Sequence, residues 1–364
     1  MPDRKFKIVV QQPRGISFDL ADSEYTIERE VLDPIGAEIV EVAAKSTDEF
    51  IEAARDADAV IARWRRITAK IIQNLDRCVV IGLGSVGADT VDVDAATEKG
   101  IVVTNVPDVF IDETADHTMS MFLAAHRRLL MMHSLTQQGR WNEGRPYFSN
   151  VSRLWGGTIG LISFGNVAKA VARRCHAFGL RVIAYDPYVG ELEMTEANVE
   201  PVTSLMELLQ RSDYVSLHAP LNDETRHLLS TEHFKAMKNS ALFINNGRGP
   251  CVDEPALIKA LQDGEIAGAA LDVFEKEPLD TESPLLRMEN VICSPHIASA
   301  TARMAPETQR RLAREIATVL QGRWPRSAVN PGAVSYTHLT LPTTGIRGRW
   351  GGGRGGWGGG GGGG

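Results

Sequence analysis

Residues 158–186 read TIGLISFGNVAKAVARRCHAFGLRVIAYD. The β-branched run at 158–162 predicts a strand, the amphipathic stretch at 166–178 predicts a helix, and the run at 181–185 predicts a second strand. A strand, a covering helix and a parallel strand are the repeating unit of a doubly wound sheet. This stretch therefore predicts an α/β fold built on a parallel sheet.

The same alternation continues on both sides of that stretch. Further apolar runs that predict strands lie at 213–218, 241–245, 268–273 and 291–294, and earlier at 7–10, 38–42, 59–62, 79–82 and 101–104. We expect two doubly wound domains of the Rossmann-like or flavodoxin-like kind, with a functional site in the cleft between them. The predicted division assigns 1–105 and 298–334 to a substrate-binding domain, 106–297 to a nucleotide-binding domain, and a helix at 300–320 to the first of these.

Two glycine-rich loops resemble the G-x-G-x-x-G turn of dinucleotide-binding proteins. Residues 82–87 (GLGSVG) match it fully, whereas residues 163–168 (SFGNVA) have serine and alanine at the first and third glycines. A dinucleotide site also needs a helix that opens at the loop and an acid about 20 residues further on for the ribose hydroxyls. Only the second loop has both, so we expect the nucleotide there. An ordinary strand-to-helix turn is the alternative.

The acid after the second loop is Asp186, which ends the predicted strand at 181–185. A carboxylate in this place repels the 2′-phosphate of NADP, and the following Pro187-Tyr188-Val189 offers no arginine to bind that phosphate. The sequence therefore favours NAD as the cofactor.

Three side chains with complementary chemistry follow predicted strands of the second domain: Arg248, Glu277 and His296. An arginine binds a carboxylate bidentately, and a histidine exchanges a proton near neutral pH. A neighbouring glutamate would fix the tautomer of that histidine and raise its pKa. These are the groups that hydride transfer to a 2-keto acid requires. Each alone could be a loop salt bridge, a solvated charge or a capping residue; their convergence at one sheet edge favours a catalytic set.

Composition limits the other possibilities. The chain has 364 residues, 43% of them hydrophobic, and a formal net charge of −7, which disfavours binding to nucleic acid. No signal peptide, membrane span or metal-binding motif is recognisable. No C-x-x-C pair occurs, so we expect the reducing cytoplasm; the cysteines are Cys78, Cys175, Cys251 and Cys293.

Residues 335–364 differ from everything before them. They begin SYTHLTLPTT and end in a Gly/Arg/Trp run, and the segment around 334–344 reads like a translated sequencing adapter. We expect a non-native, disordered tail. A Gly/Arg segment that binds RNA is the alternative.

Residues 7–331 resemble the D-isomer-specific 2-hydroxyacid dehydrogenase family. The landmarks are His218-Ala-Pro-Leu, Ala269-Ala-Leu-Asp-Val-Phe and Pro295-His-Ile, in the family's order. Residues 106–117 and 184–188 look most like the branch that contains phosphoglycerate dehydrogenase and the C-terminal binding protein corepressors. The resemblance implies an NAD-dependent oxidoreductase for a small 2-keto acid and its D-2-hydroxy acid. An NAD(H)-sensing corepressor-like protein is the alternative.

The resemblance also implies a set of site residues. Arg248, Glu277 and His296 form the catalytic triad, and the loop at Ser85, Val86 and Gly87 binds the substrate carboxylate together with Arg248 and His296. The implied NAD contacts are Phe164, Gly165, Asn166, Val167, Asp186, Pro187, His218, Ala219, Pro220, Thr225, Asn246, Gly247, Asp272 and Ser299.

Two further expectations come from the resemblance. Family members form homodimers through the nucleotide-binding domain, and Trp141 is a candidate to reach a neighbour's active site, although a core or surface tryptophan is equally consistent with the sequence. Many relatives have an arginine where Leu83 stands. Its absence predicts a substrate cleft with one cation fewer and disfavours a phosphorylated substrate.

Overall fold

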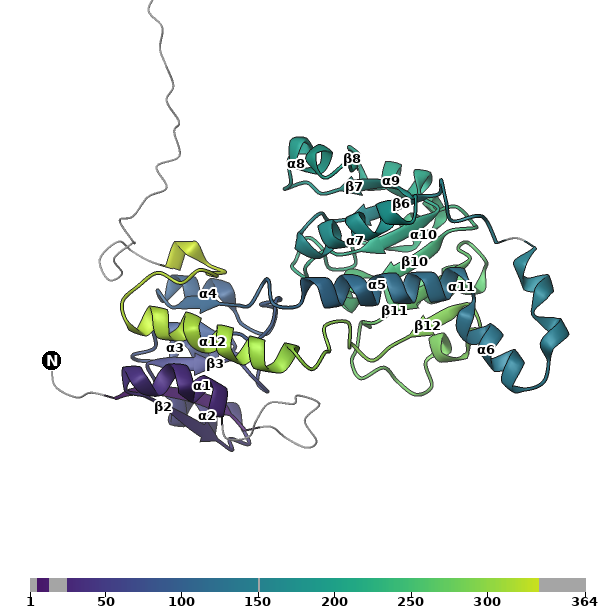
Figure 1. Ribbon diagram of the computed structural model, residues 1–364. Coiled ribbons are helices and arrows are strands. Elements are labelled where there is room, and N and C mark those ends of the chain that lie inside the picture. Colours follow the sequence, from purple (N-terminus) through teal and green to yellow (C-terminus); the bar gives the residue numbers. More distant parts are fainter. Residues whose placement is uncertain (1–4, 13–24, 150, 334–364) are drawn as a thin grey trace, which may run out of the picture.

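The computed structural model describes residues 5–12, 25–149 and 151–333, which form two α/β units around two parallel sheets (Figure 1). This is the fold class that the sequence predicts. The first sheet has the flavodoxin-like order β2-β1-β3-β4-β5. Its strands are β1 (Phe6–Gln11), β2 (Ala37–Val42), β3 (Ala59–Ile61), β4 (Val80–Gly82) and β5 (Val102–Thr104).

Helices cover both faces of the first sheet. One face packs against α1 and α12, and the other against α2, α3 and α4. The C-terminal helix α12 thus returns to the first sheet, and a Cβ at Gly82 would lie 2.7 Å from the side chains of both Leu312 and Ile316. The first glycine of the 82–87 loop therefore permits a close helix contact. The helices are α1 (Thr26–Leu32), α2 (Thr47–Ala54), α3 (Ala69–Gln73), α4 (Val93–Glu98) and α12 (Met304–Leu320).

The second sheet has the order β12-β11-β10-β9-β6-β7-β8 and is also parallel. The chain winds outward from β6 in one direction and then, from β9, in the other, which is the Rossmann arrangement. Ligands bind where the winding reverses, which here is between β6 and β9. The strands are β6 (Thr158–Ile162), β7 (Arg181–Tyr185), β8 (Glu200–Pro201), β9 (Tyr214–Leu217), β10 (Leu242–Asn245), β11 (Gly268–Leu271) and β12 (Val291–Cys293).

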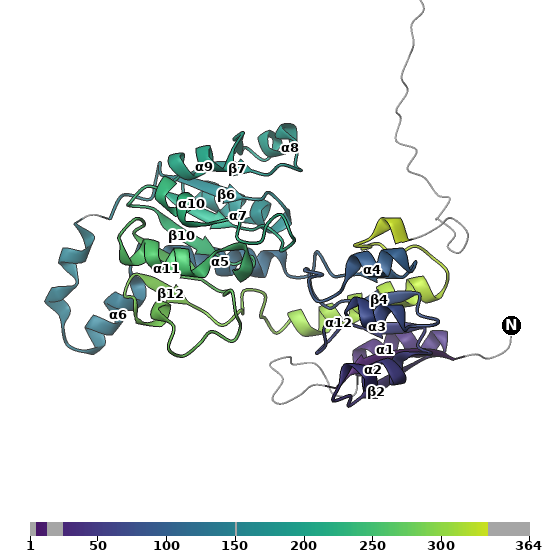
Figure 2. The same cartoon turned by 180° about the vertical axis from the view of Figure 1, so that it is seen from behind.

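The helices of the second unit form two layers (Figures 1 and 2). Helices α5 and α7 pack on one face of the sheet, and α9, α10 and α11 pack on the other. Ser204 and Asp253 cap α9 and α11, each accepting a hydrogen bond from a backbone N–H of the first turn. The helices are α5 (Ile111–His126), α7 (Asn166–Ala177), α8 (Glu191–Glu196), α9 (Leu205–Arg211), α10 (Thr231–Ala236) and α11 (Glu254–Gln262).

The amphipathic stretch at 112–130 is divided between two helices, of which α5 is the first. Helix α5 ends at His126, and Arg128 adopts a left-handed conformation (φ 47°) from which α6 (Leu129–Gln137) starts in a new direction. Helix α6 extends away from the sheet as an arm (Figure 1). The arm continues through η2 (Trp141–Glu143) and η3 (Arg145–Phe148); the other short turns are η1 (Asp33–Ile35), η4 (Gly249–Cys251), η5 (Pro284–Arg287) and η6 (Pro331–Ala333).

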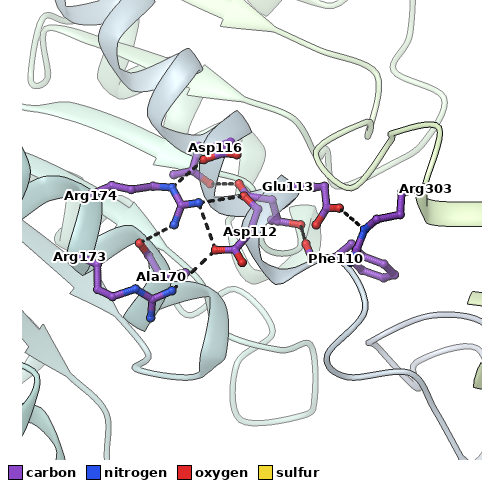
Figure 3. A network of polar contacts seen from close by, with 10 residues as sticks. Phe110, Asp112, Glu113, Asp116, Ala170, Arg173, Arg174 and Arg303 are labelled. Atoms are coloured by element: carbon purple, nitrogen blue, oxygen red, sulfur yellow. Dashed lines mark hydrogen bonds and ion pairs between the residues drawn. The ribbon is translucent and has the colours of Figure 1, made fainter. Parts of the chain in front are cut away.

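The chain crosses between the two units twice, after β5 and before α12 (Figure 2). Arg303, on the second crossover, ties the two together because its guanidinium donates to Val109 O at 2.6 Å and to Glu113 at 3.2 Å (Figure 3). The predicted division at 105/106 and 297/298 falls close to these crossovers and stays a prediction. The predicted tail, 335–364, lies outside the described residues.

The described part of the chain contains no helix long and apolar enough to cross a membrane. Within the same ranges, no group of three or more His, Cys, Asp or Glu side chains converges in a way that could hold a metal ion.

Candidate active site

A cavity of about 590 Å³ lies between the two sheets. It opens beside the carboxyl ends of β6 and β9, where the winding of the second sheet reverses. Its walls come from both units: residues 62–64, 84–90 and the start of α12 on one side, and residues 163, 165–168, 218–221, 246–248, 296, 298 and 299 on the other.

The β6–α7 loop presents backbone to this cavity. Ser163 takes a left-handed conformation (φ 71°), and a Cβ added to Gly165 would have no atom within 4 Å, so the chain is open there. The first N–H groups of a helix have no partner within the helix, and Asn166 and Val167 at the start of α7 line the cavity. The loop and helix end therefore form a site suited to a phosphate group.

Asp186 follows β7 and is held by the loop it faces. Its Oδ2 accepts hydrogen bonds from Ser163 Oγ (3.1 Å) and Phe164 N (2.8 Å), and its Oδ1 accepts one from Tyr188 N (2.8 Å). The serine that departs from the glycine pattern thus donates to the acid expected to bind the ribose. These contacts fix the carboxylate beside the β6–α7 loop.

His296 lies at the second unit's edge with its ring open to the cavity. Its Nδ1 is 2.8 Å from Glu277 Oε2. The hydrogen bond that His296 donates to the Glu277 carboxylate raises the pKa of His296 above its usual 6.5, although desolvation opposes the shift. Burial by itself would raise the pKa of Glu277, but the contact with His296 and a hydrogen bond from Phe274 N outweigh it and the net shift is downward. Both shifts favour the charged pair of imidazolium and carboxylate over the neutral pair.

The backbone turn that carries His296 is anchored on the buried Asp272. His296 is in the left-handed region (φ 52°), and its N–H donates to Asp272 O at 2.8 Å. The Asp272 carboxylate accepts from Ile297 N (3.0 Å) and Ala298 N (2.9 Å). Burial raises the pKa of Asp272, but hydrogen bonds from His117, Ser294 and these amides outweigh burial and lower it. An ionised Asp272 therefore stabilises a strained turn.

Arg248 follows β10 and reaches the wall formed by the first unit. Its Nη1 donates to Gly247 O at 2.9 Å and its Nε to Asp89 Oδ1 at 3.3 Å. A Cβ at Gly87 would lie 2.1 Å from Arg248 Nη2, so any other residue would displace the guanidinium from this position. The substrate-side loop and Arg248 are in direct contact.

Most of the residues predicted for the site meet at this one cavity. Those lining it are Ser85, Val86, Gly87, Gly165, Asn166, Val167, His218, Ala219, Pro220, Asn246, Gly247, Arg248, Asp272, His296 and Ser299. Glu277 reaches the cavity through His296, and Asp186 and Pro187 stand at its nucleotide-loop end without lining it. Thr225 does not line the cavity either. Its hydroxyl donates to Pro220 O and so orders a loop that lines the cavity.

Two of the residues considered in the sequence have their side chains in a core and not in the cavity. The Phe164 side chain is fully buried in the core of the second unit, so only its backbone can serve the nucleotide loop. Leu83 is 1% exposed and packs in the core of the first unit, because it lies two residues after Ile81 and shares that residue's face. The absence of an arginine at this position therefore says nothing about the charge of the cleft.

The residues of the site that the sequence analysis missed include three with charged or aromatic side chains on the cavity wall and one histidine behind it. Asp89, Arg63 and Trp64 line the cavity from the first unit, and His117 on α5 lies 3.2 Å from Ser294 Oγ and 3.4 Å from Asp272 Oδ1. Asp89 could have been found in the sequence, because it is an acid two residues after a glycine loop that is expected to bind an anion. The others had no such signal, because they meet the site only through tertiary packing.

The comparisons with known proteins agree with this geometry. The model of the D-isomer specific 2-hydroxyacid dehydrogenase NAD-binding domain matches residues 119–298. The glyoxylate reductase of Thermofilum pendens is 40% identical over 288 residues, which are 78% of this chain and 85% of that protein. The chain belongs to the D-isomer-specific 2-hydroxyacid dehydrogenase family. It is an NAD-binding enzyme, as the resemblance implies.

Other proteins similar to this chain include a longer one and one that was solved with NADP. The D-3-phosphoglycerate dehydrogenase of Methanocaldococcus jannaschii is 38% identical over 302 residues, which are 82% of this chain but 56% of that protein. Among solved structures, a Thermus thermophilus protein is 33% identical with a TM-score of 0.74, covering 89% of this chain and 100% of that one. A glyoxylate/hydroxypyruvate reductase of Sinorhizobium meliloti, solved with NADP and malonate, is 30% identical with a TM-score of 0.76, covering 90% and 97%.

The residues present fit the family's dinucleotide. The open backbone at Gly165 and the start of α7 suit a pyrophosphate, and Asp186 suits an unphosphorylated ribose. Both amide atoms of the buried Asn246 side chain find no hydrogen-bond partner among the described residues, although buried polar atoms normally have one. A ligand in the cavity that Asn246 lines would satisfy them.

Proposed function

We propose that this enzyme interconverts a small 2-keto acid and its D-2-hydroxy acid, with His296 as the acid/base and Arg248 as the carboxylate-binding residue. The observation that carries this proposal is the His296–Glu277 pair, 2.8 Å apart, opening into the same cavity as Arg248 and the nucleotide loop. When bound, NADH supplies the hydride for the keto carbon, and NAD⁺ accepts it in the reverse direction.

The proposed roles follow from the chemistry of each group. Arg248 and the backbone N–H groups of residues 85–87 bind the substrate carboxylate and orient the carbonyl. The His296 imidazolium donates its proton to the carbonyl oxygen as charge develops there, and in the oxidation the neutral ring takes it back. Glu277 keeps Nδ1 engaged, so that Nε2 is the nitrogen that faces the reaction.

A panel of 2-keto acids tests the proposal: glyoxylate, hydroxypyruvate, pyruvate and longer acids, with NADH oxidation followed by absorbance. His296→Ala should abolish turnover while NADH binding, measured by fluorescence, stays close to that of the parent. Arg248→Ala should raise KM for the keto acid and lower kcat. Absence of turnover on every acid would overturn the enzyme reaction proposed here, and parent-like rates in both variants would overturn the residue roles.

We also propose that two copies of the chain pair through the second unit. Large apolar side chains are exposed on the arm and beside it: Leu129 (57%), Leu130 (56%), Trp141 (72%) and Trp155 (64%). Large exposed apolar side chains of this kind are typical of a protein–protein interface. Sedimentation equilibrium should report a dimer, and Leu130→Glu should shift it to the monomer. Trp141 is the most exposed of these four side chains. If it reaches the active site of a partner copy, Trp141→Ala should change the KM for the keto acid.

A further inference from the structure

We propose that Thr308 and Gln309, near the start of α12, form a polar subsite that binds a hydroxyl group on the side chain of the 2-keto acid. The proposal rests on the function proposed above and adds the substrate class, a 2-keto acid with a hydroxyl on the carbon next to the carbonyl. It is carried by two buried polar side chains on the cavity wall that find no hydrogen-bond partner among the described residues.

Both side chains belong to the wall that the first unit contributes. Thr308 is 8% exposed and Gln309 is 2% exposed, and both line the cavity. Neither Thr308 Oγ1 nor Gln309 Nε2 has a hydrogen-bond partner within the part of the chain that the structure describes. A buried hydroxyl or amide without a partner is unfavourable, and most buried polar atoms in proteins have one. A polar group that enters the cavity would supply the partner that these two atoms lack.

Thr308 differs in this respect from other threonines in the helices of this chain. Thr318, in the same helix, donates its hydroxyl hydrogen to Arg314 O at 2.7 Å, and Thr118 in α5 donates to Thr114 O at 2.7 Å. A bond to the carbonyl four residues earlier is a common way in which a helix satisfies a threonine. Thr308 does not make this bond, since its Oγ1 has no partner among the described residues. Its hydroxyl is therefore left available to the cavity.

The subsite adjoins the loop that is proposed to bind the substrate carboxylate. A Cβ at Gly84 would lie 3.1 Å from Thr308 Cγ2, and a Cβ at Gly87 would lie 2.1 Å from Arg248 Nη2. Three residues of chain span at most about 11 Å, so the two ends of this loop are close together. An acid whose carboxylate is bound by Arg248 can therefore extend its side chain along the loop toward Thr308 and Gln309.

The chemistry of the two groups favours a hydroxyl. An amide nitrogen donates hydrogen bonds, and a threonine hydroxyl donates or accepts them. A substrate hydroxyl can accept from Gln309 Nε2 and donate to Thr308 Oγ1, which satisfies both atoms at once. An alkyl side chain satisfies neither and leaves both polar atoms without partners. A carboxylate could accept from both, and is the alternative that the experiment separates.

The test compares hydroxypyruvate with 2-ketobutyrate, which has the same size and charge but a methyl group in place of the hydroxyl. In the parent, kcat/KM should be at least about tenfold higher for hydroxypyruvate. Gln309→Met keeps the length of the side chain and removes the amide, and Thr308→Val keeps the shape and removes the hydroxyl. We expect the ratio of the two kcat/KM values to fall about tenfold in the first variant and about threefold in the second. Thr318→Val is the matched control and should leave the ratio unchanged.

Glyoxylate, which has no side chain to reach the subsite, checks that the variants are otherwise intact, because its kcat/KM should stay near that of the parent. A merely structural role of Gln309 predicts instead an equal loss on all three acids and a lower Tm of the ligand-free enzyme. Either that result or an unchanged ratio would overturn the proposal. A loss on oxaloacetate as large as the loss on hydroxypyruvate would show that the subsite binds a carboxylate, and would overturn the assignment to a hydroxyl.

A binding measurement separates a failure of this proposal from a failure of the proposed function. In the presence of NADH, which cannot accept a hydride, D-glycerate should raise Tm more than D-2-hydroxybutyrate in the parent, and Gln309→Met should abolish that difference. This readout needs no turnover. Equal shifts in the parent would contradict the subsite even in an enzyme that reduces 2-keto acids. Absence of turnover on every acid would overturn the proposed function, and the melts would still decide the subsite.

Discussion

His296 and Glu277 set the pH dependence expected of the proposed reaction. Reduction requires the imidazolium, and Glu277 raises the pKa of His296 above 6.5. The rate of keto-acid reduction should therefore be constant at pH values below this raised pKa and fall as the pH rises through it. Glu277→Gln removes the charge that stabilises the imidazolium, so we expect the fall to begin about one pH unit lower. Profiles of kcat/KM against pH would measure the shift.

A matched control is available two residues away. Glu275 also pairs with a histidine, His227, at 2.8 Å, but that ring does not line the cavity. Glu275→Gln should leave the profile where it is. A profile that moves in both variants, or in neither, contradicts the role given to Glu277.

Ser163 combines a strained backbone with a useful hydroxyl. A non-glycine residue in the left-handed region costs about 1–2 kcal/mol, and the Ser163 hydroxyl donates to Asp186. Ser163→Ala keeps the strain and loses the hydrogen bond, so we expect NADH affinity to fall about threefold or more. Ser163→Gly also loses the hydrogen bond but relieves the strain, so its Tm should exceed that of the alanine variant. Fluorescence titration and thermal melts test the two parts, and an alanine variant that binds NADH like the parent would show that Asp186 needs no help from Ser163.

At the scale of elements, one arginine adds a set of polar contacts to the apolar packing between α5 and α7 (Figure 3). Arg174 on α7 donates to Asp116 at 2.7 Å, to Asp112 at 3.1 Å and to Ala170 O at 3.0 Å, with its side chain 24% exposed. We expect Arg174→Ala to lower the free energy of unfolding by about 1–2 kcal/mol, because a branched, partly buried set of charged hydrogen bonds is lost. Urea melts would measure the change.

Its neighbour Arg173 provides the control. Arg173 is 66% exposed and lies 3.7 Å from Asp112. An exposed, single contact of this kind contributes little, so Arg173→Ala should change the stability by less than about 0.5 kcal/mol. Equal effects of the two substitutions would mean that the loss comes from helix propensity or packing and not from the network.

Periodicity predicted the strands well because buried parallel strands are short apolar runs whose side chains admit few other placements. Arg248 and His296 were predicted to lie together because each follows the end of a parallel strand, and both line the cavity. Helix limits were harder: the pattern runs unbroken past His126, and no glycine or proline marks the left-handed Arg128. A backbone that changes direction at an arginine is decided by tertiary packing, which local sequence does not contain.

The wall of the first unit shows the same limit at the site. Leu83 stands next to the glycine loop in sequence, yet it shares a face with Ile81 and points into the core, while Asp89 lies further on and meets Arg248. Which side of a loop faces a cleft depends on how the strand before it ends. Gly84, the residue after Leu83, already lines the cavity, so one position along the chain separates the core from the cavity wall.

For the whole molecule, the position of α12 decides which parts can fold alone. Leu312 and Ile316 of α12 are buried against the first sheet, not the second. The first unit therefore needs both ends of the chain, whereas the second is continuous between the crossovers. Because the cores of the second unit draw only on residues 111–293, we expect residues 106–297 expressed alone to fold and to bind NADH.

The complementary fragment supplies the contrast. Residues 1–105 without α12 would expose the apolar side chains that now cover Leu312 and Ile316, so this fragment should aggregate or remain unfolded. Circular dichroism melts and NADH fluorescence on both fragments would measure this asymmetry. A cooperative melt without NADH binding in 106–297 would mean that the first unit completes the nucleotide site. A non-cooperative melt of 106–297 would contradict the independence of the second unit and with it the predicted division of the chain.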